Sequence, residues 1–249
     1  MKRDINSALL LCAALASPFS SAGEALSLSS KRSETMLTKQ EHPLTAQQKY
    51  MAVIAAYAAT GNLPGLNSAL QQGLDAGLTV SDCREILVQL YAYAGFPRSL
   101  NALGELMKII DARKAQGIQD AQGQLPGPLP NPDEMLAAGT QNQTALAGKP
   151  VEGPLFRFAP AADEYLKTHL FGDIFSRDNL DWKSRELATV GALAAMTGVE
   201  PQLKAHLSMS INVGLTPLQL AELIPVFEEK GENIIANRLR SALDSVGAE

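Results

Sequence analysis

The residues best suited to proton transfer in this 249-residue sequence are Glu85 and His206. Imidazole titrates near neutral pH, so His206 could serve as a general acid or base. Glu85 lies half-way along an otherwise apolar predicted helix, where a half-buried carboxyl tends to have a raised pKa. Each has an ordinary structural alternative. His206 could be only a hydrogen-bonded core residue, and Glu85 could pair with an arginine such as Arg185 or Arg98.

Four further residues are secondary candidates for a site. Arg98 and Arg185 could each hold a substrate carboxylate through the guanidinium fork, or could equally pair with a glutamate. Glu222 could also transfer protons, although a pair with an arginine is the preferred interpretation. Cys83 could be a reactive thiol, but no neighbouring base is evident, which favours inert packing. With Cys12, it matches no metal or redox spacing, so no metal or cofactor is expected.

Helices must position these side chains. The segment SDCREILVQLYAYAGFPRSLNALGEL (residues 81–106) predicts one helix, a break at Gly95, and a second helix that Pro97 opens and that runs to about Ala115. Thr79 and Asp82 occupy capping positions before the first of these. Two earlier helices are predicted, from the cap at Thr45 to about Thr60 and from Pro64 to Gly77.

The two halves of the chain repeat one another at a constant offset of 137 residues. The offset aligns Gly61 with Gly198 and Glu85 with Glu222, together with the following pairs at breaking and core positions: Pro64 and Pro201, Leu66 and Leu203, Leu70 and Leu207, Gly77 and Gly214. A repeated helical unit buries its apolar face against its copy. We therefore predict an all-α fold of two tandem repeats with pseudo-twofold symmetry.

The copies differ where chemistry could reside. Copy two has His206 where copy one has Ala69, and only copy one has the YAGFP turn. Pro225 predicts a kink or an early end of its helix. We expect a single, asymmetric site in which His206 and Glu85 line one cavity, either across the pseudo-axis or across a subunit interface, with Arg98 or Arg185 nearby. The alternative is a pair of His206 with Glu222 inside copy two, with Glu85 apart.

The sequence divides into five parts: a signal peptide (1–22), a flexible leader (23–44), the first repeat (45–115), a Pro/Gly-rich connection (116–160) and the second repeat (161–249). Within the connection the one helix candidate is 133–146. The charged, apolar and small-residue order of the first part predicts a periplasmic or secreted protein. Its apolar run is too short for a transmembrane anchor. The net charge of −5 and the absence of a basic patch argue against nucleic acid as a partner.

Residues 184–224, SRELATVGALAAMTGVEPQLKAHLSMSINVGLTPLQLAELI, resemble the carboxymuconolactone decarboxylase family, and the Glu85 helix with its YAGFP turn resembles that family's C-terminal signature. The resemblance spans most of 46–113 and 181–243, in two copies. It implies an all-helical protein that assembles as a homo-oligomer and acts on a small-molecule substrate. The peroxidase branch of the family, the alkylhydroperoxidase D type, has a Cys-x-x-Cys pair, but the matching positions here are Val199 and Gln202.

Three functions remain open. The first is a cofactor-free lyase that decarboxylates a small carboxylate or lactone by acid–base chemistry, with His206 returning a proton. The second is a peroxide-reducing, peroxiredoxin-like enzyme that uses Cys83 with an external thiol. The third is a non-catalytic helical binding protein, because a fold alone does not establish a function.

Overall fold

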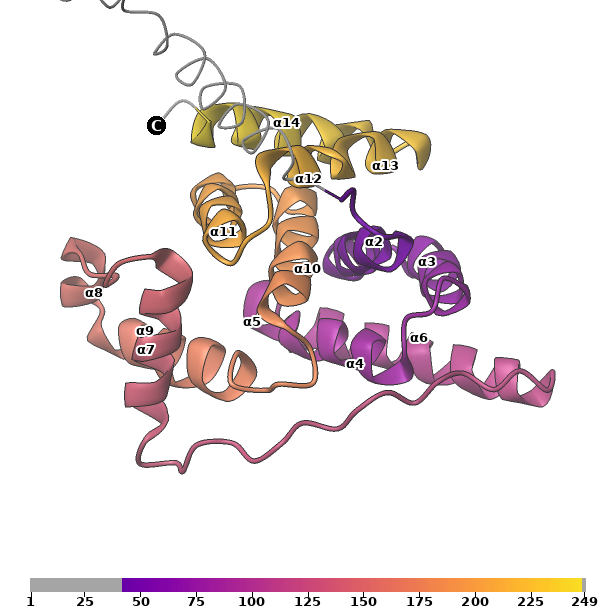
Figure 1. Cartoon of the computed structure of the whole chain (residues 1–249), viewed down its shortest axis with the longest axis horizontal. Coiled ribbons are helices and arrows are strands. Elements are labelled where there is room, and N and C mark those ends of the chain that lie inside the picture. The colour runs from indigo at the N-terminus through magenta and orange to yellow at the C-terminus, as the bar shows by residue number, and fades with distance from the viewer. Residues whose placement is uncertain (1–41, 248–249) are drawn as a thin grey trace, which may run out of the picture. The chain divides into compact units, whose positions relative to one another are not determined.

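The computed structural model describes residues 42–247, and the compact unit that contains the helices begins at Pro43 (Figure 1). The predicted signal peptide and Cys12 lie outside this part of the chain. Within it every regular element is a helix, as predicted. None of these helices is both long and apolar enough to cross a membrane.

The first repeat consists of α2 (Ala46–Thr60), α3 (Leu63–Asp75), α4 (Val80–Gln89), α5 (Tyr91–Ala94) and α6 (Phe96–Ala115). The predicted caps are confirmed: Thr45 closes a capping box with Gln48, and Thr79 closes one with Asp82. The first repeat differs from the prediction at Leu90, where the expected single helix divides into α4 and α5.

The second repeat has the same helix order, with α10 (Trp182–Ala195), α11 (Glu200–Asn212), α12 (Pro217–Ala221), α13 (Leu223–Glu229) and α14 (Asn233–Val246). The bounds of α11 are those of α3 shifted by 137 residues. The predicted interruption near Pro225 is also present, since α12 ends at Ala221, four residues before it. A proline ring clashes with the carbonyl four residues earlier, which explains why the helix divides there.

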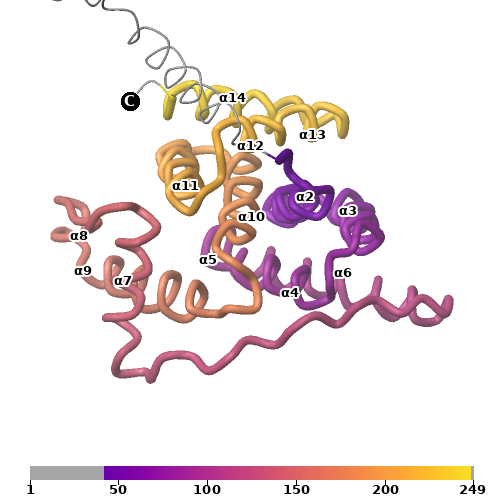
Figure 2. Tube along the Cα trace, in the orientation of Figure 1, coloured from indigo at the N-terminus to yellow at the C-terminus, as the bar shows by residue number. Residues whose placement is uncertain are grey.

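Equivalent helices of the two repeats pack against each other at the centre of the fold. α2 and α10 lie side by side (Figures 1 and 2), α2 also contacts α13, and α10 makes the reciprocal contact with α5. Gly191 permits the close approach, because a Cβ at that position would lie 2.1 Å from the carbonyl oxygen of Ala52. One apolar core contains side chains from both repeats. The two repeats thus share one core with pseudo-twofold symmetry.

The connection is more structured than expected. It contains α7 (Met135–Ala147), close to the predicted helix, and α8 (Pro154–Phe158); α9 (Pro160–Tyr165) and a π-helix (Leu166–Ile174) then lead into the second repeat. α7 and the π-helix form a second apolar cluster around Phe171 and Phe175. The extended part before α7 runs past the start of α4. There the Val80 and Ser81 backbone N–H groups donate to Ala121 and Gln122, which satisfies donors that a helix N-terminus leaves unpaired.

The expected flexible leader does not extend as far as Leu44. That side chain is 4% exposed, and its backbone N–H donates to Glu222 Oε1 at 3.1 Å. A buried side chain and a hydrogen bond to the second repeat fix this end of the leader. The boundary predicted at residue 44 is therefore too late.

Candidate functional site

The structure pairs His206 with Glu186, a residue that the sequence analysis did not single out. His206 Nδ1 lies 2.8 Å from Glu186 Oε2, and both side chains are buried. Tyr93 meets the imidazole edge-on, with ring centroids 5.5 Å apart. The site thus draws on both repeats, because Tyr93 is in α5 of the first, Glu186 is in α10 and His206 is in α11.

Residues at the helix starts explain where α10 and α11 begin. Asp181 caps α10 by accepting from the Ser184 N–H at 2.8 Å, and Pro201 occupies the first turn of α11. The α10 and α11 helices pack against each other, which brings Glu186 and His206 together. Ser210 donates to the His206 carbonyl at 2.7 Å.

Three buried polar atoms around this pair have no hydrogen-bond partner among the described residues: the Tyr93 hydroxyl, Glu186 Oε1 and Arg185 Nε. Burial, and then the negative charge of Glu186, raise the pKa of the Tyr93 phenol, so it is a neutral donor. Unsatisfied buried polar groups are uncommon in native proteins and call for an explanation. For Tyr93, a side-chain hydrogen bond with Thr189 acts in the opposite direction and lowers the pKa of the phenol. The arrangement provides polar groups that a small ligand or a water molecule could satisfy.

Glu85 lies in a separate ion-pair cluster. Arg177 holds it with two hydrogen bonds, Nε to Oε2 at 2.8 Å and Nη2 to Oε1 at 2.7 Å, and Arg185 adds one at 3.1 Å. The carboxylate is only 2% exposed. Both of its oxygens are therefore occupied by guanidinium groups from the second half of the chain.

The expectation of a raised pKa at Glu85 is wrong. Burial alone would raise the pKa of this carboxyl, but the hydrogen bonds from Arg177 and Arg185 outweigh it and hold the pKa at about 2. A carboxylate ionised at all ordinary pH values is a poor proton donor. The alternative interpretation, in which Glu85 pairs with an arginine, describes this residue better. The sequence predicts Arg185 as a partner, but not Arg177.

The two Nη groups of Arg185 are also engaged within the protein. It is completely buried, and its Nη groups donate to Glu85, to Gln89 Oε1 at 3.2 Å and to the Arg177 carbonyl at 2.9 Å. Gln89 donates in return to the Arg185 carbonyl. Arg185 is therefore a partner of Glu85. Its Nη groups are not available to bind a substrate carboxylate.

The other candidates lie elsewhere. Arg98 is exposed and packs over Gly61, where an added Cβ would lie 1.5 Å from its Nη1. Glu222 pairs with Lys49 at 2.8 Å on the surface, so the predicted arginine partner is wrong. Cys83 is a free thiol with no exposed surface. Burial, and then the charge of Asp82, raise its pKa to about 12.

His206 pairs with Glu186 and Glu222 pairs with Lys49, so the alternative pairing of His206 with Glu222 is wrong. A cavity shared by His206 and Glu85, within the chain or across a subunit interface, stays a prediction. Tyr93 lies between the two clusters, because its ring meets His206 and its hydroxyl is within electrostatic range of Arg185 and Glu186. The first repeat thus contributes a phenol beside His206 rather than a carboxylate.

The sequence contained a signal for one of the two missed residues. Glu186 is a charged residue inside the apolar helix RELATVGALAA, the same feature that drew attention to Glu85. Arg177 carried no such signal, because it lies in the irregular segment between the π-helix and α10. Only the packing of that segment against α4 brings it to Glu85.

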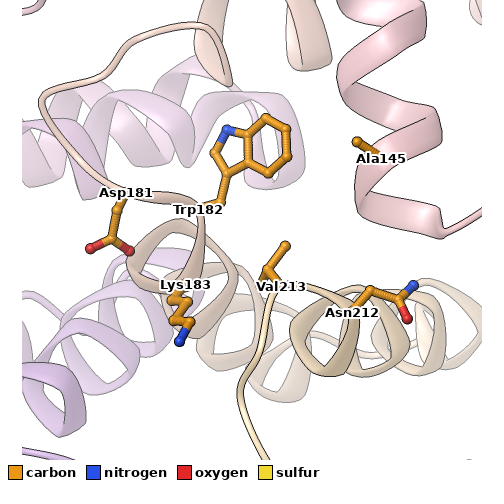
Figure 3. Close-up of a pocket in the computed structure, with 6 residues that line it drawn as sticks. All are labelled: Ala145, Asp181, Trp182, Lys183, Asn212 and Val213. Atoms are coloured by element: carbon orange, nitrogen blue, oxygen red, sulfur yellow. The ribbon is translucent and has the colours of Figure 1, made fainter.

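A surface pocket of about 480 Å³ lies beside the first turn of α10, one turn before Glu186 (Figure 3). Its lining includes the indole of Trp182, whose Nε1 donates to the Phe175 carbonyl at 2.9 Å, and Ala145 of α7. Neither His206 nor Glu186 lines this pocket. In the described part of the chain, no cluster of three or more acidic, His or Cys side chains could hold a metal ion.

These observations define an all-α protein of two tandem repeats with a buried Glu–His pair beside a tyrosine from the other repeat. The carboxymuconolactone decarboxylase family model matches residues 32–107 and 160–228, one segment in each repeat and together more than half of the chain. The chain belongs to the carboxymuconolactone decarboxylase family. A comparison with curated proteins gave no match.

Proposed function

We propose that this protein is a cofactor-free carboxy-lyase in which His206 transfers the proton and Glu186 orients its imidazole. The 2.8 Å contact between His206 Nδ1 and Glu186 Oε2, buried beside Tyr93, is the observation that supports this proposal. A carboxylate that holds one ring nitrogen leaves Nε2 as the nitrogen that can meet a substrate. Glu186 is thus a positioning residue, and His206 the catalytic residue.

Decarboxylation needs a group that stabilises the developing negative charge, as well as an acid that supplies a proton. When the carbon–carboxylate bond breaks, its electron pair passes into an adjacent carbonyl and forms an enolate, while carbon dioxide leaves. Tyr93 offers a buried hydroxyl that could donate to the enolate oxygen. His206 then gives its proton to the carbon. The substrate class that fits is a small lactone acid or a related carboxylate with a carbonyl near the carboxyl group.

The test measures carbon dioxide release from carboxymuconolactone and from small 3-oxo acids. We expect His206→Gln to lower kcat by about 10²–10⁴-fold, and Tyr93→Phe to lower kcat with a smaller change in KM. Glu222→Gln, on the surface, is the matched control and should retain activity. Each variant is checked by circular dichroism for a native fold. No carbon dioxide release by the wild type, or equal release by His206→Gln, would reject the lyase proposal.

The peroxidase alternative depends on a thiolate at Cys83. A fully buried thiol whose pKa is raised to about 12 is a poor nucleophile. We therefore expect Cys83→Ser to leave any activity unchanged. Thiol-dependent peroxide turnover that disappears in this variant, with the fold retained, would favour the peroxidase over the lyase.

We further propose that the protein is exported, as its N-terminal sequence suggests. Export places the substrate outside the cytoplasm. Amino-terminal sequencing of the protein from the periplasmic fraction should begin close to residue 23. A mature chain that begins at Met1 would contradict export.

A further inference from the structure

The cavity of about 480 Å³ beside the first turn of α10 has the size of a site for a small organic ligand. It is named here the Trp182 pocket, and its lining residues are Ala145, Asp181, Trp182, Lys183, Asn212 and Val213. In Figure 3 the indole ring lies between Ala145 of α7 and Val213, which follows α11. The hydrogen bond from Trp182 Nε1 to the Phe175 carbonyl fixes the orientation of the ring. The pocket therefore offers a rigid aromatic surface with small apolar side chains beside it.

Polar side chains at the rim of the pocket indicate what kind of ligand it suits. Lys183 is exposed, and within residues 42–247 it forms no ion pair. Asp181 is already engaged as the cap of α10, because it accepts from the Ser184 N–H. Asn212 donates to the Leu146 carbonyl at 3.0 Å, which ties the wall formed by α7 to the end of α11. An ammonium without a partner beside an aromatic surface suits a ring that carries a carboxylate.

The Trp182 pocket and the His206 pair lie along the same seam between two helices. Helices α10 and α11 pack against each other. On α10, Glu186 comes one turn after Trp182, about 6 Å along the axis. On α11, His206 comes two turns before Val213. Residues four or seven apart share a face of a helix, so both helices turn the pocket and the buried pair to the same side.

Met209 lies on this face between the pocket and His206. It comes three residues after His206 and four residues before Val213, and it is 8% exposed. It belongs to the second apolar cluster, against which Trp182 and Val213 pack. A methionine side chain is unbranched and has three rotatable bonds, so it adapts its shape more easily than other apolar side chains. Rotation of this one side chain would open the pocket toward His206.

We infer that the Trp182 pocket binds a small ring carboxylate and delivers it past Met209 to His206. The ring stacks on the indole, and the carboxylate pairs with Lys183. The delivery step rests on the proposed function, because it supplies the substrate of that reaction. Binding at the pocket is independent of any reaction and is tested separately.

The fluorescence of Trp182 reports binding directly, because it is the only tryptophan in the sequence. The full chain is titrated with benzoate, benzyl alcohol and acetate, which separate the contributions of the ring and the carboxylate. We expect saturable quenching by benzoate, weaker binding of benzyl alcohol and no saturable change with acetate. Lys183→Met should weaken benzoate binding by about two- to fivefold and leave benzyl alcohol unaffected. Equal benzoate binding by Lys183→Met would overturn the carboxylate contact.

A variant that fills the pocket tests its location. Ala145→Phe should abolish the quenching by benzoate. Ala137→Phe is the matched control, because Ala137 is exposed on the same helix and does not line the pocket. It should bind benzoate as the wild type does. A wild type without saturable quenching, or benzoate binding that persists in a natively folded Ala145→Phe variant, would overturn the binding site.

Carbethoxylation by diethyl pyrocarbonate, followed by peptide mass spectrometry, tests the route to His206. His169, whose side chain is 47% exposed, is the internal control and corrects for reagent that benzoate consumes. Benzoate and Ala145→Phe should each slow the modification of His206 severalfold relative to His169, and Met209→Ala should accelerate it. A His206 that resists the reagent in Met209→Ala, or that reacts equally when the pocket is filled, would overturn the route.

The same variants separate this inference from the lyase proposal. Benzoate binding that protects His206, without carbon dioxide release by the wild type, would reject the lyase and retain the pocket. Carbon dioxide release that Ala145→Phe does not slow would retain the lyase and reject delivery through the Trp182 pocket.

Discussion

Three buried or half-buried carboxylates illustrate how the surroundings decide the role of a residue type. Glu85 faces two guanidinium groups, Glu186 faces an imidazole and Glu222 faces the ammonium of Lys49. Glu85 and Glu222 occupy the same position of the repeat, yet the first is buried and the second is about one-quarter exposed. The repeated sequence position therefore does not imply an equal energetic role.

Replacing Glu85 should be much more harmful than replacing Glu222. Glu85→Gln leaves the buried Arg185 without its charged partner, which should cost about 3–5 kcal/mol of unfolding free energy. Glu222→Gln removes only a partly exposed pair with Lys49 and should cost about 1 kcal/mol or less. Urea unfolding of the two variants measures both values. Equal losses would show that the Glu85 cluster does not stabilise the fold.

The lowered pKa of Glu85 also predicts an acid dependence of stability. The pKa of this carboxyl is about 2 in the folded protein and about 4.3 in an unfolded chain. As the pH falls, the unfolded chain therefore binds a proton at Glu85 before the folded protein does. The stabilisation that the Glu85 ion pairs give is complete above about pH 4.5 and is lost as the pH falls to about 2. A difference of about two units corresponds to about 3 kcal/mol.

Urea unfolding at a series of pH values measures this loss. The Glu85→Gln variant should have a flatter profile over the same range, because it lacks the titrating group. Identical acid slopes for wild type and variant would assign the acid sensitivity to other carboxylates.

At the scale of elements, close contacts between helices depend on glycines. Gly191 allows α10 to approach α2, and Gly139 allows α7 to approach the π-helix, where a Cβ would lie 1.7 Å from the Lys167 carbonyl oxygen. The same residue type at Gly104 has open space around it. Gly191 and Gly104 both lie inside helices, so they differ mainly in what surrounds them.

Gly191→Ala should therefore destabilise the protein, while Gly104→Ala should stabilise the fold. The first forces α2 and α10 apart and should cost about 1–3 kcal/mol of unfolding free energy. The second gains helix propensity, up to about 1 kcal/mol. Thermal unfolding of each variant and of the wild type compares the two. A stabilised Gly191→Ala variant would contradict the described packing of α2 against α10.

At the scale of the whole molecule, the two repeats depend on each other. The main core takes side chains from both, for example Ile54 and Leu66 from the first and Leu187 and Leu207 from the second. Ion pairs also cross between the halves, because Glu85 pairs with Arg177 and Arg185. Neither repeat buries its apolar face by itself.

We expect the separate halves, residues 42–115 and 161–247, to lack a cooperative fold on their own and to regain it when mixed. The reason is that each exposes the α2 or α10 face that the other covers. Circular dichroism with thermal unfolding of each half, and of the mixture, measures this. Cooperative unfolding of an isolated half would show that the repeats are independent domains.

The sequence by itself determined the helical repeats. Periodicity, capping residues and the 137-residue offset located the helices, their order and the break near Pro225, because these features act over a few residues of chain. It also identified the family, and it predicted His206 as a candidate site residue. The one break that it missed, at Leu90, has no proline or glycine to mark it.

Tertiary structure alone decided which charged groups meet. Glu186 and Tyr93 meet His206, and Arg177 meets Glu85, from positions far apart in the sequence. Side-chain partners over such separations follow from helix packing rather than from local pattern. The burial and pairing of Glu85 reversed its expected pKa, because two guanidinium groups outweigh the cost of desolvation. The sequence determined which residues can ionise, whereas the packing of α4, α5, α10 and α11 determined their partners.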